Sequence, residues 1–187
     1  METDVEKKTT ELKTALVRLG RHLDKVEDTG LLVWVIPRAL ACAHRPLRHH
    51  KTFGKELKGR NLPPEAAPHV LAWVRRIREL GIRSIICLMH SKELQHYARL
   101  DLGAANLLAL YEKVGLSVRH IEWDDPAHRT GLKPATYAED LARARVEALD
   151  AFDKLPKPVL LHCSAGIDRS SPVAAYIWQM RVCRSDA

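Results

Sequence analysis

The stretch PVLLHCSAGIDRSSPVAAYIW, residues 158–178, decides the fold that this sequence predicts. It begins with an apolar run that ends at His162, passes through a short loop containing a glycine, and then enters a helix-forming segment. A continuous apolar run of this length is typical of a buried strand in a parallel sheet. Ligands in open α/β sheets bind beyond the carboxyl ends of the strands, so we expect residues 163–169 to form a binding site.

Strand-like and helix-like segments alternate along the rest of the chain. Short apolar runs bounded by Gly, Pro or polar turns predict strands at 31–37, 82–89, 116–123 and 158–162. Apolar residues at helical spacing predict helices at 3–27, 64–80, 91–114, 135–154 and 170–183. Residues 38–62 look irregular. This alternation predicts an α/β fold, with a central and mostly parallel sheet of four to five strands flanked by helices.

Residues 1–29 are expected to form an additional amphipathic helix before a single α/β domain at 30–187. Leucines recur every three or four residues on one face of this helix, at positions 12, 16, 19 and 23. The apolar stripe predicts that the helix covers apolar surface of the α/β domain. Pairing of the stripe between two chains is the alternative.

The composition argues against several classes of protein. No apolar run reaches the roughly 18 residues of a membrane span, and the charged N-terminus lacks the apolar stretch of a secretory signal. The four cysteines, at positions 42, 87, 163 and 183, do not have metal-ligand spacing. A reduced, cytoplasmic compartment is the simplest interpretation.

The chain carries a formal net charge of +7, which favours contact with polyanions. Its densest basic cluster, at 45–60, contains Phe53 as its one aromatic residue and therefore makes a poor platform for stacking nucleic-acid bases. The cluster is interpreted as a solvated loop or a rim that attracts phosphate, with a true polyanion site as the alternative. Charge alone does not decide the function.

The loop after the strand at 158–162 has the residues that a tetrahedral oxyanion requires. Ser164, Ala165 and Gly166 are small, so the backbone can curl and point its N–H groups into one concavity. The following helix N-terminus adds partial positive charge. Arg169 has a planar fork that matches two phosphate oxygens.

Cys163 is placed to act as a nucleophile in this cradle. A thiol beside a helix N-terminus and an arginine favours its thiolate form, and a thiolate can attack phosphorus. The hydroxyl of Ser170 is expected to stabilise the sulfur as a leaving group. An isolated cysteine would be interpreted as a small buried hydrophobe, but the combined spacing of Cys163, Gly166, Arg169 and Ser170 favours catalysis.

The segment HCSAGIDRS, residues 162–170, resembles the HCxxGxxR[ST] signature of the cysteine-dependent protein tyrosine phosphatase superfamily. The compact layout is most similar to the dual-specificity branch, and the resemblance covers roughly residues 30–183. It implies a phosphatase-like fold, with Cys163 as nucleophile and a phosphate-binding loop that includes Ile167, Asp168 and Arg169. It also implies that His162 helps to set the environment of the cysteine.

The same resemblance implies a general acid on the loop after the third predicted strand, where the sequence reads IEWDDP at 121–126. A carboxyl there would protonate the leaving oxygen. Asp124 is favoured because it comes directly off the strand, and Asp125 is the close alternative. An aspartate before proline is also common in ordinary turns, so one of the two is expected to be only that.

The loop residues bear on the substrate. No lysine occurs at 164–168, and Asp168 would repel a polyanionic head group. A phosphorylated protein or peptide is therefore the first choice of substrate, a phosphorylated nucleic-acid end such as an RNA 5′-phosphate the second, and a phosphoinositide the third. A catalytically inactive phosphate-binding module is the alternative to an enzyme. The family's chemistry needs no metal or organic cofactor.

Two features depart from the family pattern. Family members usually continue with further helices after the signature helix, whereas this sequence stops at Ala187. Cys87, near the end of the strand at 82–89, is interpreted as a core residue. The alternative is that it forms a disulfide with Cys163 once that thiolate has been oxidised.

Overall fold

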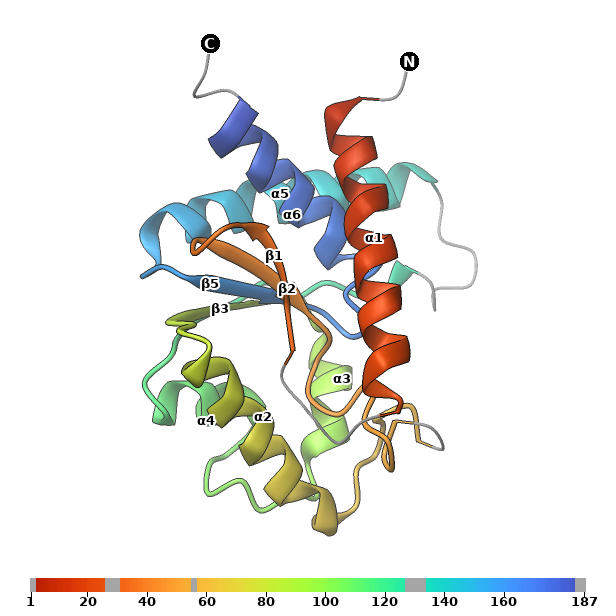
Figure 1. The fold of residues 1–187 in the computed structure, drawn as a ribbon, viewed down its shortest axis with the longest axis vertical. Helices are drawn as coiled ribbons and strands as arrows, with labels where there is room; N and C mark the ends of the chain where they lie inside the picture. Colours follow the sequence, from red (N-terminus) through yellow and green to blue (C-terminus); the bar gives the residue numbers. More distant parts are fainter. Residues whose placement is uncertain (1–2, 26–30, 55–56, 127–133, 184–187) are drawn as a thin grey trace.

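The computed structural model describes residues 3–25, 31–54, 57–126 and 134–183 (Figure 1). Five strands form one sheet: β1 Val33–Ile36, β2 Leu40–Ala43, β3 Ser84–Cys87, β4 Ser117–His120 and β5 Val159–His162. Their order across the sheet is β1-β2-β5-β3-β4. The pair β1–β2 is antiparallel and the other three pairs are parallel. The predicted α/β fold with a mostly parallel sheet is confirmed.

The prediction that residues 38–62 are irregular was wrong at β2. Its sequence, LACA, holds two alanines and no β-branched or aromatic residue, so the pattern gives little strand signal. The segment becomes a strand because it lies in register beside β5, from Leu40 opposite Val159 to Ala43 opposite His162. Tertiary pairing outweighs local propensity here.

Helices cover both faces of the sheet (Figure 1). One face carries α1 Asp4–Leu23, α5 Pro134–Lys154 and α6 Ser170–Trp178. The other face carries α2 Ala67–Glu79, with the 3-10 turn η1 Pro64–Ala66 before it, α3 Ser91–Leu94, the 3-10 turn η2 Gln95–Tyr97 and α4 Leu107–Lys113. These elements match the predicted helices in order. The last two residues of the predicted helix at 3–27 lie outside the described residues.

Two predicted helices differ in extent from the observed ones. The single helix expected at 91–114 is divided into α3, η2 and α4, because Gly103 has a φ of +60° and Asn106 then caps a new helix by accepting from the Ala109 N–H. The helix expected at 170–183 is α-helical only to Trp178 and continues as a π-helical turn, η4 Gln179–Cys183.

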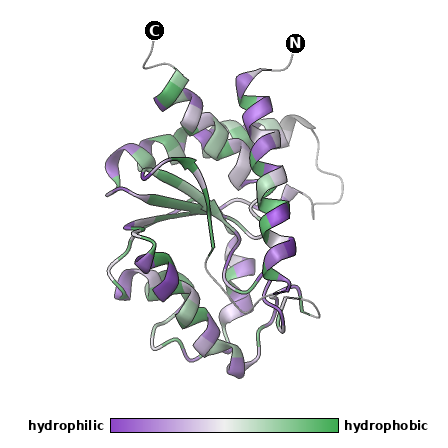
Figure 2. Ribbon diagram, in the orientation of Figure 1, coloured by the Kyte–Doolittle hydropathy of each residue, from purple (hydrophilic) through white to green (hydrophobic). Residues whose placement is uncertain are grey.

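The strands are buried on both faces, and alternate residues belong to different halves of the core. In β3, Ile85 packs with α2 and α4, whereas Ile86 packs with α5 and α6. In β5, Leu160 belongs to the first half and Leu161 to the second. Figure 2 shows the strands as mostly hydrophobic, between helices that mix hydrophobic and hydrophilic residues.

Helix α1 packs along α6 and covers part of the core. A capping box between Thr3 and Glu6 begins the helix. Leu12 and Leu16 are buried in the same half of the core as α6, at 3% and 0% exposure. The leucine stripe therefore covers apolar surface within the same chain.

In the described part of the chain, every helix is too short or too polar to cross a membrane.

Replacing Leu16 with alanine is expected to lower the free energy of unfolding by about 2–5 kcal/mol, since it removes a fully buried side chain and leaves a cavity. The matched control is Val17→Ala on the same helix. Val17 is 37% exposed, so its truncation is expected to cost less than about 1 kcal/mol. Equal losses in urea unfolding would contradict an integral packing role for α1.

Candidate active site

The loop between β5 and α6 lies at the carboxyl ends of the parallel strands. Cys163 directly follows β5, and Arg169 directly precedes α6. Both side chains are buried, at 2% and 1% exposure. Because β5 lies between β2 and β3, the loop emerges from the centre of the sheet. The predicted binding loop is therefore at the place where open α/β sheets bind ligands.

Three consecutive carbonyl oxygens of the loop face polar groups on its outer side. Ser164 O accepts from Arg45 N at 3.1 Å, Ala165 O lies 2.8 Å from His44 Nδ1, and Gly166 O accepts from Ser171 Oγ at 2.7 Å. Two of these partners come from the segment after β2 and one from the first turn of α6. The backbone of the loop is thus held from outside.

The outward carbonyls determine where the loop amides point. In a trans peptide unit the C=O and the following N–H point in opposite directions. The N–H groups of residues 165–167 are therefore directed to the inner side of the loop. One of them is seen in contact there, because Gly166 N–H donates to Cys163 Sγ at 3.2 Å. Inward amides at the start of a helix form a concave site for an oxyanion.

Gly166 is required by both conformation and space. Its φ of +72° lies in the left-handed region, where L side chains are strained. A Cβ atom at this position would lie 3.2 Å from Ala43 O and 3.2 Å from Leu16 Cδ1. The tight curve of the loop is thus packed directly against β2 and α1.

Arg169 is fixed by carboxylates and carbonyls from three other segments. Its Nη1 donates to Glu93 Oε2 at 2.6 Å, Trp123 O at 2.8 Å and Leu88 O at 3.1 Å. Its Nη2 donates to Glu93 Oε1 at 2.8 Å and Asp125 Oδ2 at 3.2 Å. The guanidinium plane is therefore held in one orientation at the loop.

Glu93 is a site residue that the sequence analysis missed. Burial raises the pKa of its carboxyl, but the hydrogen bonds and charge of Arg169, the backbone N–H of His90 and the charge of Arg45 together outweigh burial, so the net pKa is lowered. Burial alone would also lower the pKa of Arg169, whereas Glu93, Cys163 and Asp125 raise it above its ordinary value. The sequence signal that could have identified Glu93 is its position: it follows the carboxyl end of β3, at the same edge of the sheet as Cys163.

The two candidate acids occupy different places. Asp125 Oδ2 contacts Arg169, whereas Asp124 Oδ1 accepts the backbone N–H of Asp125 at 2.9 Å. Both line a pocket of about 230 Å³, together with Arg60, His90, Lys92, Glu93 and His96. The structure thus brings Asp125 to the guanidinium of Arg169. Most of the acidic loop that follows, residues 127–133, lies outside the described residues.

His162 is buried beside Cys163. Its Nδ1 lies 3.2 Å from Cys163 O, and its Nε2 lies 3.4 Å from the hydroxyl of Tyr111. Burial, with smaller contributions from Arg45 and Arg169, lowers the pKa of His162 to about 4. The ring is therefore neutral at pH 7, and it supports the backbone of Cys163 rather than supplying a charge.

The remaining loop residues have separate surroundings. Ser170 is fully buried, and within the described residues its Oγ makes no hydrogen bond. Asp168 is half-buried and lies 3.6 Å from Lys13 Nζ of α1. Ala165 and Ile167 are also half-buried. The structure therefore brings all the predicted loop residues together around Cys163.

Three buried cysteines lie close to the centre of the sheet, and all are free thiols. Burial raises the pKa of Cys87 to about 12 and also raises the pKa of Cys42. Cys87 is opposite His162 in the β3–β5 register, one residue from Cys163. Cys87 is fully buried in the core, as interpreted from the sequence, and a disulfide with oxidised Cys163 remains the alternative.

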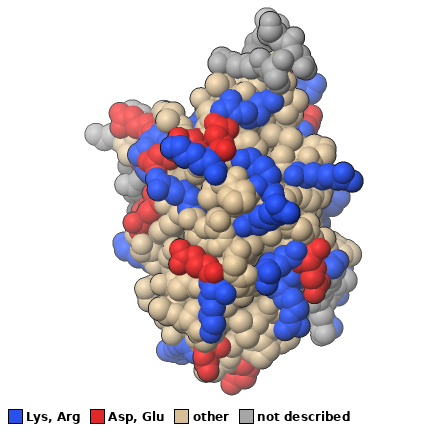
Figure 3. Space-filling view, turned by 90° about the vertical axis from the view of Figure 1, so that its left-hand side faces the viewer, with Lys and Arg blue, Asp and Glu red and all other residues tan. Residues whose placement is uncertain are grey.

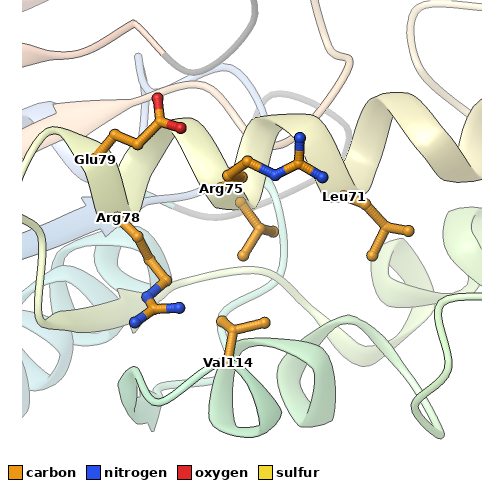
Figure 4. A pocket seen from close by; sticks show the side chains of 6 residues that line it. Leu71, Arg75, Arg78, Glu79 and Val114 are labelled. Carbon is orange, nitrogen blue, oxygen red and sulfur yellow. The ribbon is translucent and has the colours of Figure 1, made fainter.

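A second and larger pocket, of about 510 Å³, lies elsewhere, between α2 and the end of α4. Figure 4 shows the apolar side chains of Leu71 and Val114 together with the guanidinium groups of Arg75 and Arg78 around it. It contains no nucleophile. The residues that line it do not overlap those of the site at Cys163, so pocket size does not identify the chemistry here.

Among the described residues, no cluster of three or more His, Cys, Asp or Glu side chains is arranged to hold a metal ion. No protein-family model and no curated protein matches the chain.

The neutral state of His162 predicts a pH dependence of stability. In the unfolded chain this histidine takes up a proton near pH 6.5, but in the folded protein it does so only near pH 4. The unfolded state therefore binds more protons in this interval, and stability is lost as pH falls through it. The contribution is up to about 1.4 kcal/mol per pH unit.

We expect His162→Asn to reduce by about this amount the slope of unfolding free energy against pH between pH 4.5 and 6. Urea unfolding at several pH values would measure the slope. Replacing the exposed His22 in the same way is the control and should leave the slope unchanged. An unchanged slope in His162→Asn would contradict the buried neutral assignment.

Proposed function

We propose that this chain is a cysteine-dependent phosphatase, similar to the dual-specificity branch, which hydrolyses phosphomonoesters through a phosphocysteine intermediate. The observation that supports this most directly is the loop around Cys163. Polar groups on the outer side of the loop turn its amides inward, and the Gly166 amide donates to Cys163 Sγ. The side chain of Arg169 lies at the end of the same loop. A sulfur nucleophile at the base of an oxyanion site is suited to attack on phosphorus.

In the first step, the Cys163 thiolate attacks phosphorus, the S–P bond forms, and the P–O bond to the leaving group breaks. The three other phosphate oxygens lie among the amides of residues 165–167 and the Arg169 guanidinium. The leaving oxygen takes a proton from a carboxyl group, which converts it into an alcohol or phenol.

In the second step, water attacks phosphorus, the S–P bond breaks, and sulfur leaves as the thiolate. The carboxylate takes the proton from the water, and inorganic phosphate is released. The hydroxyl of Ser170 is available to donate to the departing sulfur, since it is buried and makes no hydrogen bond within the described part of the chain.

The geometry supports Asp125 as the general acid, although its position in the sequence favoured Asp124. Asp125 already contacts Arg169, the residue that would bind the phosphate. A bound phosphate would compete for Arg169 Nη2 and leave the Asp125 carboxyl beside the leaving oxygen. Asp124 uses its carboxylate to hold the backbone of Asp125, which is a turn-forming role.

A phosphorylated protein or peptide remains the first choice of substrate. Asp168 is at the loop and forms an ion pair with Lys13, and both side chains are part-exposed. On the face shown in Figure 3, Lys and Arg side chains are interspersed with Asp and Glu. A nucleic-acid 5′ end therefore remains the second choice and a phosphoinositide the third.

We expect the protein to hydrolyse p-nitrophenyl phosphate and Cys163→Ser to lose at least a thousandfold in rate, because serine is a far weaker nucleophile at neutral pH. Retention of tungstate binding by the Ser variant would show that the loop is intact. Equal rates for the two proteins would favour an inactive phosphate-binding module.

Rates on phosphotyrosine and phosphothreonine peptides, 5′-phosphorylated and 5′-triphosphate RNA, and inositol phosphates would then rank the substrate classes. Higher kcat/KM on RNA than on every peptide would replace the first choice with the second.

Asp125→Asn is expected to lower kcat on an alkyl phosphate at least tenfold, because an alkoxide leaving group needs a proton. Tungstate affinity should be retained in this variant. Asp124→Asn is the matched control and should reduce kcat less than threefold. The reverse order of effects would assign the acid to Asp124.

A further inference from the structure

Arg45 is a second buried arginine at the phosphate loop. It follows β2 and is 2% exposed. Its Nε donates to Ser164 Oγ at 3.1 Å, and its backbone N–H donates to Ser164 O at 3.1 Å. Arg45 therefore contacts the residue next to Cys163 through both its side chain and its main chain.

The other partners of the Arg45 guanidinium are all neutral. Nη1 donates to Gly59 O and to the Tyr97 hydroxyl, and Nη2 donates to Lys58 O at 3.1 Å. Across the described residues, no carboxylate makes a hydrogen bond or ion pair with it, and Glu93, which pairs with Arg169, interacts with its charge only at longer range. A buried charge without a counter-ion costs several kcal/mol even when it is hydrogen-bonded.

The backbone that supplies carbonyls to Arg45 includes a non-glycine residue in the left-handed region. Lys58 has a φ of +49°, and the next residue, Gly59, adopts a φ of +61° readily because it has no side chain. For a non-glycine residue such as Lys58 this conformation costs about 1 kcal/mol or more. The loop thus carries strain where its carbonyls meet the guanidinium.

The charges around Cys163 are unevenly matched. Arg169 is offset by two carboxylates, Glu93 and Asp125. Even with Asp125 protonated as the general acid, Glu93, a thiolate and a phosphate dianion together would outweigh the single positive charge of Arg169. Arg45 is the buried cation at the loop that makes no direct ion pair with a carboxylate in the described part of the chain.

We propose that Arg45 is a positioning residue of the phosphate site, whose buried and unmatched charge supplies the attraction that holds a doubly charged oxyanion in the loop. It acts through Ser164 and through its electric field, without touching the ligand. Burial strengthens this field, since few water molecules screen it. The inference rests on the proposed phosphatase function, because it assigns the counter-charge to that same site.

Two substitutions separate the charge of Arg45 from its hydrogen bonds. Arg45→Lys and Arg45→Gln both lose the guanidinium fork, but only the Gln variant loses the charge. We expect the dissociation constant for tungstate to rise at least tenfold in Arg45→Gln and less than threefold in Arg45→Lys. Calorimetry, or the shift of Tm with tungstate concentration, would measure it.

Arg48→Gln is the matched control. Arg48 reaches the same Lys58 carbonyl, at 3.4 Å, from a partly exposed position and makes no hydrogen bond to residues 163–169 in the described part of the chain, so its variant loses the same formal charge without a contact to the loop. Its tungstate affinity should change less than threefold. Equal losses in Arg45→Lys and Arg45→Gln, or an equal loss in Arg48→Gln, would overturn the proposal.

Anions of one shape and different charge give a test on the unmodified protein, which can overturn the proposal even if the Arg45 variants do not fold. Sulfate and perchlorate are both tetrahedral, and we expect sulfate to bind at least tenfold more tightly. Equal affinity would overturn the role of Arg45. Failure of the wild type to bind tungstate or sulfate at all would instead remove the proposed phosphate site.

Discussion

The site depends on hydrogen bonds made to the outer side of the loop that joins β5 to α6. An oxyanion cradle needs several N–H groups directed at one point, and isolated backbone has no preference for that arrangement. Here the carbonyls of Ser164, Ala165 and Gly166 face Arg45, His44 and Ser171, so the planarity of the peptide units turns the following amides inward. The direction of the amides is thus decided by groups that face away from the ligand.

This constraint also explains why α1 belongs to the same structural unit as the loop. Leu16 approaches Gly166 with its side chain, and its carbonyl lies 2.9 Å from His44 Nε2. Burial lowers the pKa of His44 to about 3, so at pH 7 its ring is neutral and its single N–H serves either Leu16 O or Ala165 O. The helix and the loop therefore share the single N–H of His44 as a donor. A change in the position of α1 would alter the hydrogen bonding of the loop.

The electrostatics of the site rest on two buried arginines in different situations. Arg169 is oriented by Glu93 and Asp125, which align its fork but also offset its charge. Arg45 is surrounded by neutral acceptors, so its charge remains available to an anion. Arg169 contributes hydrogen-bond donors in a fixed direction, and Arg45 contributes an electric field that attracts an anion. Neither function follows from the presence of an arginine alone.

Much of this protein could be predicted from the sequence, because the signals are local. The apolar run before Cys163 indicated β5, and the spacing of Cys163, Gly166 and Arg169 indicated an oxyanion loop. The alternation of strands and helices indicated the α/β fold, since burial on both faces of a parallel sheet requires that pattern. Other features depend on partners that are distant in the chain, and only the tertiary structure decided them. The strand at Leu40–Ala43 forms through its pairing with β5. The contacts of Glu93 and Arg45 likewise join segments that are far apart in the sequence. Their roles depend on which charges meet at the end of the sheet, and sequence spacing carries no information on that.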